Sequence, residues 1–419
     1  MSCSDRRSFW KASRAGLLGL LLSRYTMPSL ARAATLPTAK AKACILLWMN
    51  GGPSHIDTFD PKPGTPSGGS FKAIKTRAAG VQIAEHLPRI ASVADRIAFV
   101  RSMSSREGNH ARAQFLLHTG YAPNPTVQHP SFGAWASREL GDPSADLPAF
   151  VSIGGPSLGP GFLGVQHGPF IVMKAGDMPQ NLTLSPGVDD ARFERRRAAL
   201  DAMEQRFAGE TGDAKVEGRR AVYAKAERLM KSPRAKVFDL STEPDAAKKA
   251  YGDTDFGRGC LLARRLVETG TRFVEVVLDG WDTHKDNFGR VKKLSTTLDD
   301  AMGGLLADLA ERKLLASTLV VCMGDFGRSP KINGNDGRDH HPQAWSALLA
   351  GGGVRGGIAH GATDAAGEKV LGTPTSVPDL LATIASLLGM DPQKSVVTPS
   401  GRPIALTDNG TPIRALLAT

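Results

Sequence analysis

The chain has 419 residues, of which 41% are hydrophobic and 22% are charged, and it carries a formal net charge of +11 at pH 7. This length is typical of one large domain with an insertion, or of two domains. The basic residues do not form a stripe interleaved with aromatic residues, so the composition gives no reason to expect a nucleic-acid partner.

Segment 1–33 is predicted to be a twin-arginine signal peptide. It combines the paired arginines of Asp5–Lys11, an apolar run at Gly16–Leu22 and small residues for cleavage at Ala31–Ala33. The apolar run is too short to span a bilayer, and no later run approaches that length. The segment carries six basic residues and one acidic residue, so its removal lowers the formal net charge from +11 to +6. We therefore expect a periplasmic or otherwise exported protein that uses the twin-arginine machinery and has no transmembrane segment after processing.

The most informative stretch of the sequence begins with a predicted strand, Thr318–Met323. This apolar, β-branched run has the length of a strand that is buried on both faces. It is followed by Gly324 and Asp325. Asp325 is therefore expected at the carboxyl end of a strand, where open α/β sheets bind their ligands.

A polar loop after Asp325 is predicted to lead to Asp339, His340 and His341. Two adjacent histidines beside a carboxylate are typical metal ligands. Taken alone, the same residues are equally consistent with solvated loop histidines. Their position opposite Asp325 makes them a candidate metal site.

A second predicted strand, Ala43–Met49, also ends in polar residues. Asn50 follows it directly and can offer an amide oxygen to a metal or an amide nitrogen to an oxyanion. Further along, His55 and Asp57 lie on the same side if the loop is extended. The alternative is a Gly-Pro turn with polar surface residues. We treat this loop as part of a possible additional site made of Ser54, His55, Asp57 and Asp339.

A third predicted strand, Thr271–Leu278, leads to Asp282 and His284. These two residues are separated by one position, so their side chains can converge on one cation in an extended loop.

A fourth strand is predicted at Ile97–Val100, followed by a helix that begins near Asn109 and stops at Gly120. His110 then lies in the first helical turn, where backbone N–H groups and the helix dipole favour an anion. A histidine in a first turn is more often structural or solvated, so the local sequence is only weak evidence for a functional role of His110.

The remaining pattern alternates strands with helices, which predicts an α/β domain spanning residues 40–419. Residues 189–236 are highly charged and carry apolar residues at helical spacing, which predicts a helical insertion. Further elements are expected as helices at His86–Asp95, Asp255–Thr269, Leu294–Leu314 and Pro378–Leu388, and as a strand at Ala344–Ala350.

Five motifs occur in a fixed order along the chain: WMNGGPSHIDTFDPKP, NHARAQFLLHTG, GWDTH, GDFGR and GRDHHP. With these motifs the chain resembles an uncharacterised, twin-arginine-exported family of sulfatase-like proteins within the alkaline phosphatase superfamily. The resemblance implies a mostly parallel β-sheet sandwiched by helices, with a metal centre at the strand ends. It agrees with the polar strand ends found independently above.

The resemblance also implies roles for individual residues. In the superfamily one metal is held by an Asp and a His after a strand and by a distant His. These ligands match Asp282, His284 and His340, with His341 as the competing choice for the last.

A second metal of the superfamily is less well matched. It normally takes an Asp after the first strand and an Asp-His pair after a later one, where this chain has Asn50 and Asp325-Phe326. The nucleophile position, ten residues before Gly120, is occupied by His110 rather than by Ser, Thr or Cys. These departures put a two-metal mechanism in doubt and leave one metal in place. Cys260–Arg264 resembles a sulfatase signature but has Leu at its third position, so we reject it as the nucleophile.

Two functional hypotheses follow from the sequence. The first is an exported, metal-dependent hydrolase that acts on the phosphate or sulfate ester of an anionic small molecule or polysaccharide. Zinc or manganese is expected because imidazole ligands dominate the site, with Asp325 and Asn50 near the metal. His110 would serve as nucleophile or general acid, and Arg328 would bind the anion bidentately, with Asn109 beside them. The second hypothesis is a catalytically inactive relative that binds an anion, a glycan or a protein partner.

Overall fold

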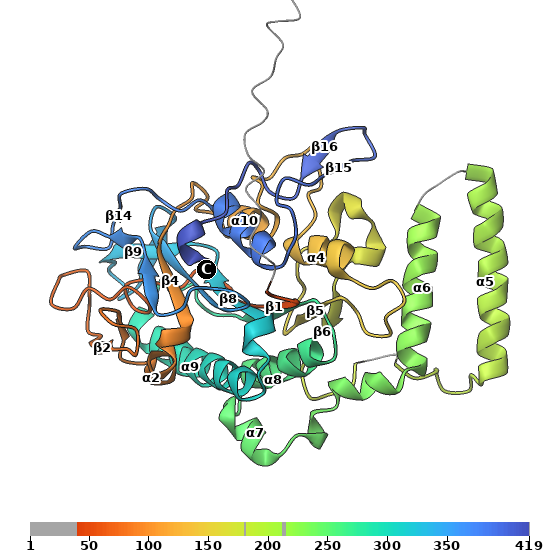
Figure 1. Cartoon of the computed structure of the whole chain (residues 1–419), viewed down its shortest axis with the longest axis horizontal. Coiled ribbons are helices and arrows are strands. Elements are labelled where there is room, and N and C mark those ends of the chain that lie inside the picture. Colours follow the sequence, from red (N-terminus) through yellow and green to blue (C-terminus); the bar gives the residue numbers. More distant parts are fainter. Residues whose placement is uncertain (1–39, 180–181, 212–214, 419) are drawn as a thin grey trace, which may run out of the picture. The chain divides into compact units, whose positions relative to one another are not determined.

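The protein is built around an eight-stranded sheet with the strand order β12-β4-β11-β8-β1-β7-β5-β6 (Figure 1). The computed structural model describes residues 40–179, 182–211 and 215–418, so the predicted signal peptide, 1–33, lies outside the described residues. In sheet order the strands are β12 (Ile358–His360), β4 (Ile97–Met103), β11 (Trp345–Gly351), β8 (Thr318–Gly324), β1 (Ala43–Met49), β7 (Phe273–Leu278), β5 (Phe150–Ile153) and β6 (Phe170–Val172).

The sheet is mostly parallel, as the resemblance predicted. Strand β11 pairs antiparallel with both β8 and β4, whereas the other pairings within this sheet are parallel. Met49 at the end of β1 is level with Leu278 of β7 and Gly324 of β8. The three loops that follow these strands therefore leave the same edge of the sheet side by side, which is where ligands bind in open α/β sheets.

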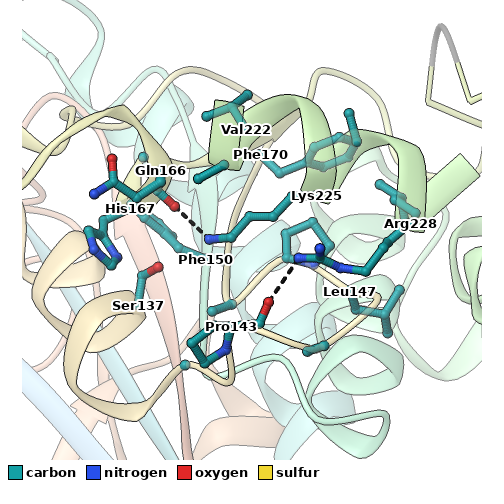
Figure 2. A pocket seen from close by; sticks show the side chains of 18 of the residues that line it. Ser137, Pro143, Leu147, Phe150, Gln166, His167, Phe170, Val222, Lys225 and Arg228 are labelled. Carbon is teal, nitrogen blue, oxygen red and sulfur yellow. Dashed lines mark hydrogen bonds between the residues drawn. The ribbon is translucent and has the colours of Figure 1, made fainter. Parts of the chain in front are cut away.

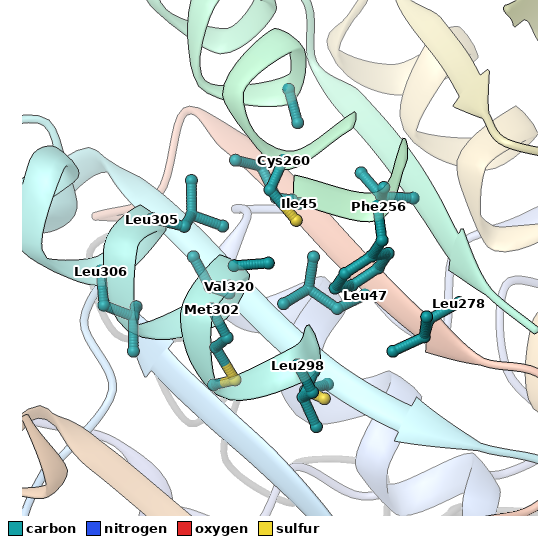
Figure 3. Close-up of a cluster of buried hydrophobic side chains, with 14 of the residues drawn as sticks. Ile45, Leu47, Phe256, Cys260, Leu278, Leu298, Met302, Leu305, Leu306 and Val320 are labelled. Atoms are coloured by element: carbon teal, nitrogen blue, oxygen red, sulfur yellow. The ribbon is translucent and has the colours of Figure 1, made fainter. Parts of the chain in front are cut away.

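Helices cover both faces of the sheet because the central strands are apolar on both sides. In β1, Ile45 and Leu47 belong to one buried cluster, and Leu46 and Trp48 belong to the other. The first cluster includes α8 (Asp255–Glu268) and α9 (Asn287–Glu311), and Figure 3 shows their side chains packed on Ile45 and Leu47. The second includes residues of α3 (His110–Thr119), α4 (Phe132–Leu140) and α10 (Val377–Leu387). Each fully buried aliphatic side chain stabilises such a layer by about 1.5–3 kcal/mol.

Two predicted helices have different bounds in the structure. Helix α9 begins seven residues before the predicted start, after Asp286, which adopts a left-handed conformation. The helix expected at 86–95 is shortened to α2 (Pro88–Ser92). Proline disfavours helical geometry in the residue before it, so the helix cannot extend back through Leu87.

The segment after Asp325 was predicted as a loop, and this was wrong because it forms a two-stranded hairpin. Strands β9 (Gly327–Ile332) and β10 (Arg338–His341) pair antiparallel, with a register shift between Arg338 and His340. Asn333 closes the turn, since its side-chain oxygen accepts from the backbone N–H groups of Asn335 and Gly337. The polar composition of these strands hid them from a hydrophobic pattern.

Smaller elements complete the described chain. The segment predicted as a helical insertion contains α5 (Asp190–Thr211) and α6 (Lys215–Lys231), and α7 (Asp245–Ala250) follows. Three short hairpins pair β2 (Ala73–Lys75) with β3 (Gln82–Ala84), β13 (Ala362–Thr363) with β14 (Val370–Leu371), and β15 (Ser395–Val397) with β16 (Pro403–Ala405). None of the helices in the described part of the chain has the length and apolarity needed to cross a bilayer.

Candidate metal centre

Four titratable side chains meet at the carboxyl edge of the sheet. Asp282 and His284 come from the loop after β7, His340 from strand β10, and His110 from the first position of α3. One ligand atom each of His110, Asp282 and His340 lies within 4.8 Å of the others, which makes this trio a candidate metal-binding group. Three separate strand-end segments thus deliver their side chains to one point.

One carboxylate oxygen is the centre of this arrangement. The Nε2 atoms of His284, His110 and His340 lie 3.2, 3.4 and 3.5 Å from Asp282 Oδ1, respectively. The Nε2 atoms of His284 and His340 are only 2.9 Å apart. Asp282 has 45% of its side chain exposed, so a ligand can reach the group from solvent.

Each of the three imidazole rings is held through its other nitrogen. His340 Nδ1 donates to the carbonyl oxygen of Gly108 (2.7 Å), and the Nδ1 atoms of His284 and His110 face carboxylate oxygens of Asp339 (3.1 Å) and Asp325 (2.6 Å). These partners only accept, so the ring proton belongs on Nδ1 and a neutral ring presents a lone pair at Nε2. Histidines that ligate metals are oriented in this way by their second nitrogen.

The donor set fits a cation that prefers nitrogen and carboxylate ligands. A tetrahedral site with bonds of about 2.0–2.1 Å places its ligand atoms about 3.3 Å apart, close to the separations of 2.9, 3.2 and 3.5 Å among His284, Asp282 and His340. Without a cation or an added proton, the lone pairs of His284 and His340 repel each other. His110 Nε2 is buried and has no hydrogen-bond partner among the described residues. Imidazole-rich sites of this kind suit zinc or manganese better than calcium.

Arg328 holds Asp282 in its ionised form. Burial alone would raise the pKa of Asp282, but the hydrogen bond and charge of Arg328, with the nearby imidazoles, lower the pKa to about 2. Arg328 Nη2 lies 2.5 Å from Asp282 Oδ1. Asp282 is therefore a carboxylate at any physiological pH, as a metal ligand must be.

The predicted bidentate contact between Arg328 and an anion is not available in this structure. Its side chain is fully buried, and three of its four other N–H groups donate to the backbone carbonyl oxygens of Gly51, Gly52 and Arg338, which leaves one N–H and no bidentate pair. The guanidinium therefore fixes the positions of Asp282 and of the loop after β1. We replace its predicted substrate contact with this positioning role.

Two further features fix the loop that carries Asp282. Arg290 of α9 donates to the backbone carbonyl oxygens of Asp282 and Gly280. Gly51 is required on the other side, because a Cβ atom there would lie 2.4 Å from the backbone nitrogen of Asp282. Neither residue was predicted to belong to the site. Arg290 is the fourth residue of α9, a helix that was predicted to begin only at Leu294.

His110 is paired with a carboxylate that has no contact with solvent. Asp325 is completely buried, and its Oδ2 atom lies 2.6 Å from His110 Nδ1. This hydrogen bond raises the pKa of His110, while partial burial of the ring works in the opposite direction. Asp325 therefore orients His110 and is not one of the three residues whose ligand atoms lie within 4.8 Å of one another, although it was predicted as a metal ligand.

Two other predicted ligands are hydrogen-bonded to other partners. His341 turns to the opposite side of β10, where its Nε2 atom hydrogen-bonds the carbonyl oxygen of Glu368. Asn50 donates to Asp279 (2.9 Å) and accepts from Gln114 (2.6 Å), so both ends of its amide have protein partners. The alternation of side chains along a strand selects His340 over His341, and this could not be predicted for a segment expected to be a loop.

The possible additional site is a structural centre. Asp57 is fully buried and forms two hydrogen bonds with Arg338, of 2.7 and 2.9 Å, and a third with Asn287. His55 is buried, hydrogen-bonds the carbonyl oxygen of Gly367, and has its pKa lowered to about 4, mainly by burial. Ser54 accepts from the backbone N–H of Asp57. Of the predicted set only Asp339 reaches the candidate metal centre, through His284.

Asn109 caps helix α3. Its side-chain oxygen accepts from the backbone N–H of Arg112, which is the usual contact of an N-cap residue. The structure thus assigns Asn109 a local role that fixes the position of His110, in place of the predicted catalytic one.

Fold and site together define an α/β protein with a mostly parallel sheet and a candidate metal centre at the carboxyl ends of its strands. The chain belongs to the family described as "Protein of unknown function (DUF1501)", whose model matches residues 41–417. No curated protein matches it by sequence.

Several solved structures are similar to this chain at low identity. A protein in the alkaline phosphatase superfamily from Vibrio parahaemolyticus is 12% identical over 86% of this chain and 71% of its own, with a TM-score of 0.38. The phosphonate monoester hydrolase of Silicibacter pomeroyi is 11% identical over 90% and 76%, with a TM-score of 0.38. The alkaline phosphatase of the Antarctic bacterium TAB5 is 15% identical over 77% and 95%, with a TM-score of 0.30. With all three scores below 0.5, the activities in these names remain those of the proteins that carry them.

Proposed function

We propose that this protein is an exported, metal-dependent hydrolase that cleaves a phosphate or sulfate ester of an anionic small molecule or polysaccharide. The observation that carries the proposal is the convergence of three imidazole Nε2 atoms on Asp282 Oδ1, each ring being fixed through Nδ1. Holding these nitrogen lone pairs and the carboxylate oxygen together costs free energy unless a cation is bound between them, which supports a bound metal.

Asp282, His284 and His340 would hold zinc or manganese. A bound divalent cation supplies positive charge to an ester oxygen and stabilises the negative charge that develops there. The protein's own part is to keep Asp282 ionised through Arg328 and to keep both histidine lone pairs directed at one point.

His110 is the residue proposed to act on the ester. It begins α3, so an anion beside it would also meet the backbone N–H groups of the first helical turn. With its proton on Nδ1 the ring can attack the phosphorus or sulfur atom through Nε2; the N–P or N–S bond forms as the bond to the alcohol oxygen breaks, and water later cleaves the new bond. In its protonated form the ring can instead donate a proton from Nε2 to the leaving oxygen. Asp325 holds the ring in position for either role.

The test combines metal analysis with turnover. The protein purified without chelator is expected to contain zinc or manganese and to hydrolyse at least one of p-nitrophenyl phosphate, bis(p-nitrophenyl) phosphate and p-nitrophenyl sulfate. His110→Ala should abolish turnover and leave the metal content unchanged. Loss of metal from this variant would instead make His110 a ligand, and unchanged turnover would move the chemistry to another group.

Phe326 favours a second candidate function. It occupies the place where the resemblance implies a metal-binding histidine, is fully buried, and lies with its ring 4.8 Å from that of His110. A site altered in this way could bind an anion, a glycan or a protein partner without cleaving it. Metal content without turnover of any of the three esters, together with retention of the protein on a sulfated or phosphorylated glycan, would favour this alternative.

The proposal includes export through the twin-arginine machinery. It rests on the motif at residues 5–11, which lies outside the described residues. Replacing both Arg6 and Arg7 with Lys is expected to leave the unprocessed protein in the cytoplasm. Processed double mutant in the periplasm would rule out this route.

A further inference from the structure

A cavity lies between α6 and the end of the sheet that is formed by β5 and β6. It has a volume of about 470 Å³ and is bordered by α4, residues 141–150, residues 165–170 and α6. Figure 2 shows side chains from these segments directed into it. None of the residues of the candidate metal centre lines this cavity.

The walls of the cavity are largely apolar. Leu147 lies before β5, Phe150 in β5, Phe170 in β6 and Val222 in α6 (Figure 2). Leu229 of α6 also lines the cavity. A volume of about 470 Å³ is within the range of roughly 300–1,000 Å³ found for small-molecule sites, which are usually apolar with a few polar groups.

The polar groups of the cavity are incompletely bonded. Gln166 Oε1, His167 Nδ1 and Arg228 Nε are buried and have no hydrogen-bond partner among the described residues. Three such atoms around one cavity are unusual, because buried polar groups are nearly always hydrogen-bonded. Since these three atoms have almost no exposed surface, they lie behind the wall of the cavity, and the cavity's selectivity depends on the charged groups that reach it.

Positive charge is concentrated at the same place. Lys225 and Arg228 both line the cavity and bond only to backbone carbonyl oxygens, those of Gln166 (2.7 Å) and Pro143 (2.8 Å). Neither forms an ion pair with a carboxylate in the described part of the chain. The lining also contains two carboxylates, Asp142 and Asp146, which accept from Ser144 and Ser232 and keep their negative charge; against Arg138, Lys225 and Arg228 they leave a surplus of one positive charge.

The titration behaviour of these groups agrees with an excess of positive charge. Burial lowers the pKa of Lys225, and the neighbouring Arg228 lowers it further. Burial, followed by the charges of Lys225 and Arg138, lowers the pKa of His167 to about 4. Each cation in this cavity thus makes the next one less favourable, and a bound anion would relieve that repulsion.

We propose that this cavity binds an amphiphilic monoanion, with the chemistry of a fatty acid: an apolar body carrying one anionic head. The body packs against Leu147, Phe150 and Phe170, and the head is bound by Lys225 and Arg228. The apolar walls alone would accept any hydrophobic molecule, but Lys225 and Arg228, which have no carboxylate partner among the described residues, select for an anion.

The test uses the full-length processed protein and the fluorescent probe 8-anilinonaphthalene-1-sulfonate, an aromatic molecule with one sulfonate. Its fluorescence is expected to rise on binding, and decanoate should displace it. Decanol and decyltrimethylammonium, which share the alkyl chain but lack the negative charge, should displace it at least tenfold less well, because charge-assisted hydrogen bonds to the head are lost. Equal displacement by all three compounds would contradict the proposed selection for an anion.

Substitutions of residues that line the cavity test whether the probe and decanoate bind there. Lys225→Met and Arg228→Gln should each weaken decanoate binding about tenfold, and Ala221→Trp should block the cavity by volume. Arg220→Gln and Tyr223→Ala change residues of α6 that do not line the cavity and serve as matched controls. Decanoate binding that is unchanged in Ala221→Trp, with far-UV circular dichroism showing the native helix content, would overturn the proposal. If Ala221→Trp does not fold, unchanged binding in both charge variants would overturn it equally.

Discussion

Two groups of polar side chains at the same edge of the sheet have opposite hydrogen-bonding states. Around Asp57, the five N–H groups of Arg338 all donate, two to the carboxylate and three to the backbone carbonyl oxygens of Ser67, Ser329 and Pro330. Around Asp282, the Nε2 atoms of three histidines are directed at one carboxylate oxygen. Neutral rings carry no proton on Nε2, so these short contacts are not hydrogen bonds.

This difference teaches that residue type does not decide whether a polar strand end is structural or functional. Both groups contain Asp and His or Arg after a buried strand, and both were predicted as sites. Asp57 and Arg338 are buried, and every N–H group of Arg338 has an acceptor, so this pair stabilises the fold and leaves no group free for a ligand. The Asp282 group is partly exposed and unsaturated, which is the state expected of residues that await a ligand.

The largest expected effect is on stability, at Asp57. Asp57→Asn keeps the shape of the side chain but leaves the charge of Arg338 buried without a counter-ion, which should lower the free energy of unfolding by about 3–5 kcal/mol. His284→Gln, in the half-exposed group, should change it by less than about 0.5 kcal/mol. Urea denaturation of the metal-free proteins measures both. Equal losses in the two variants would remove the distinction between the groups.

Metal addition should act on only one group. At a concentration of 100 times its dissociation constant, zinc or manganese should raise the free energy of unfolding of the native chain by about 2.7 kcal/mol. The same metal should stabilise His284→Gln much less. His284→Gln is preferable here to a change at Asp282, because Asp282 also balances the buried charge of Arg328. Equal stabilisation of the two proteins would place the metal elsewhere.

A smaller effect is expected from Asp339, which touches the metal centre only through His284. Asp339→Ala removes the acceptor of His284 Nδ1 (3.1 Å) and should weaken metal affinity about 10–100-fold. Asp336→Asn, in the turn of the same hairpin, is the matched control and should leave metal affinity unchanged. Isothermal titration with zinc measures the affinities, and an unchanged value for Asp339→Ala would contradict the orienting role.

The smallest expected effect is at Asn109. Asn109→Ala removes the cap of α3 and should lower the free energy of unfolding by about 1 kcal/mol. Metal content should be unaffected, because the side chain of Asn109 hydrogen-bonds the backbone N–H of Arg112 and, among the residues that the structure describes, none of the proposed ligands. A loss of turnover that far exceeds the loss of stability, measured with any ester the protein hydrolyses, would restore the catalytic role that the sequence suggested.

Much of the fold could be predicted because the strands that build it are apolar on both faces. β1, β8 and β7 stand out as continuous hydrophobic runs, and the residues that follow them lie at one edge because parallel strands share their direction. The hairpin of β9 and β10 was missed since its strands are polar and are held by Arg328 and Arg338 rather than by a hydrophobic face.

The sequence by itself determined which residues could reach the carboxyl edge: Asp282, His284, one of the two adjacent histidines and His110 all come from the ends of predicted elements. Only the tertiary structure decided what each of them does there. Strand alternation directs His340 rather than His341 to the site. Arg328 and Asp325 hold Asp282 and His110 in position. The reason is physical, because a donor or acceptor counts as free only after every neighbour in space has been considered, and most of those neighbours are distant in sequence.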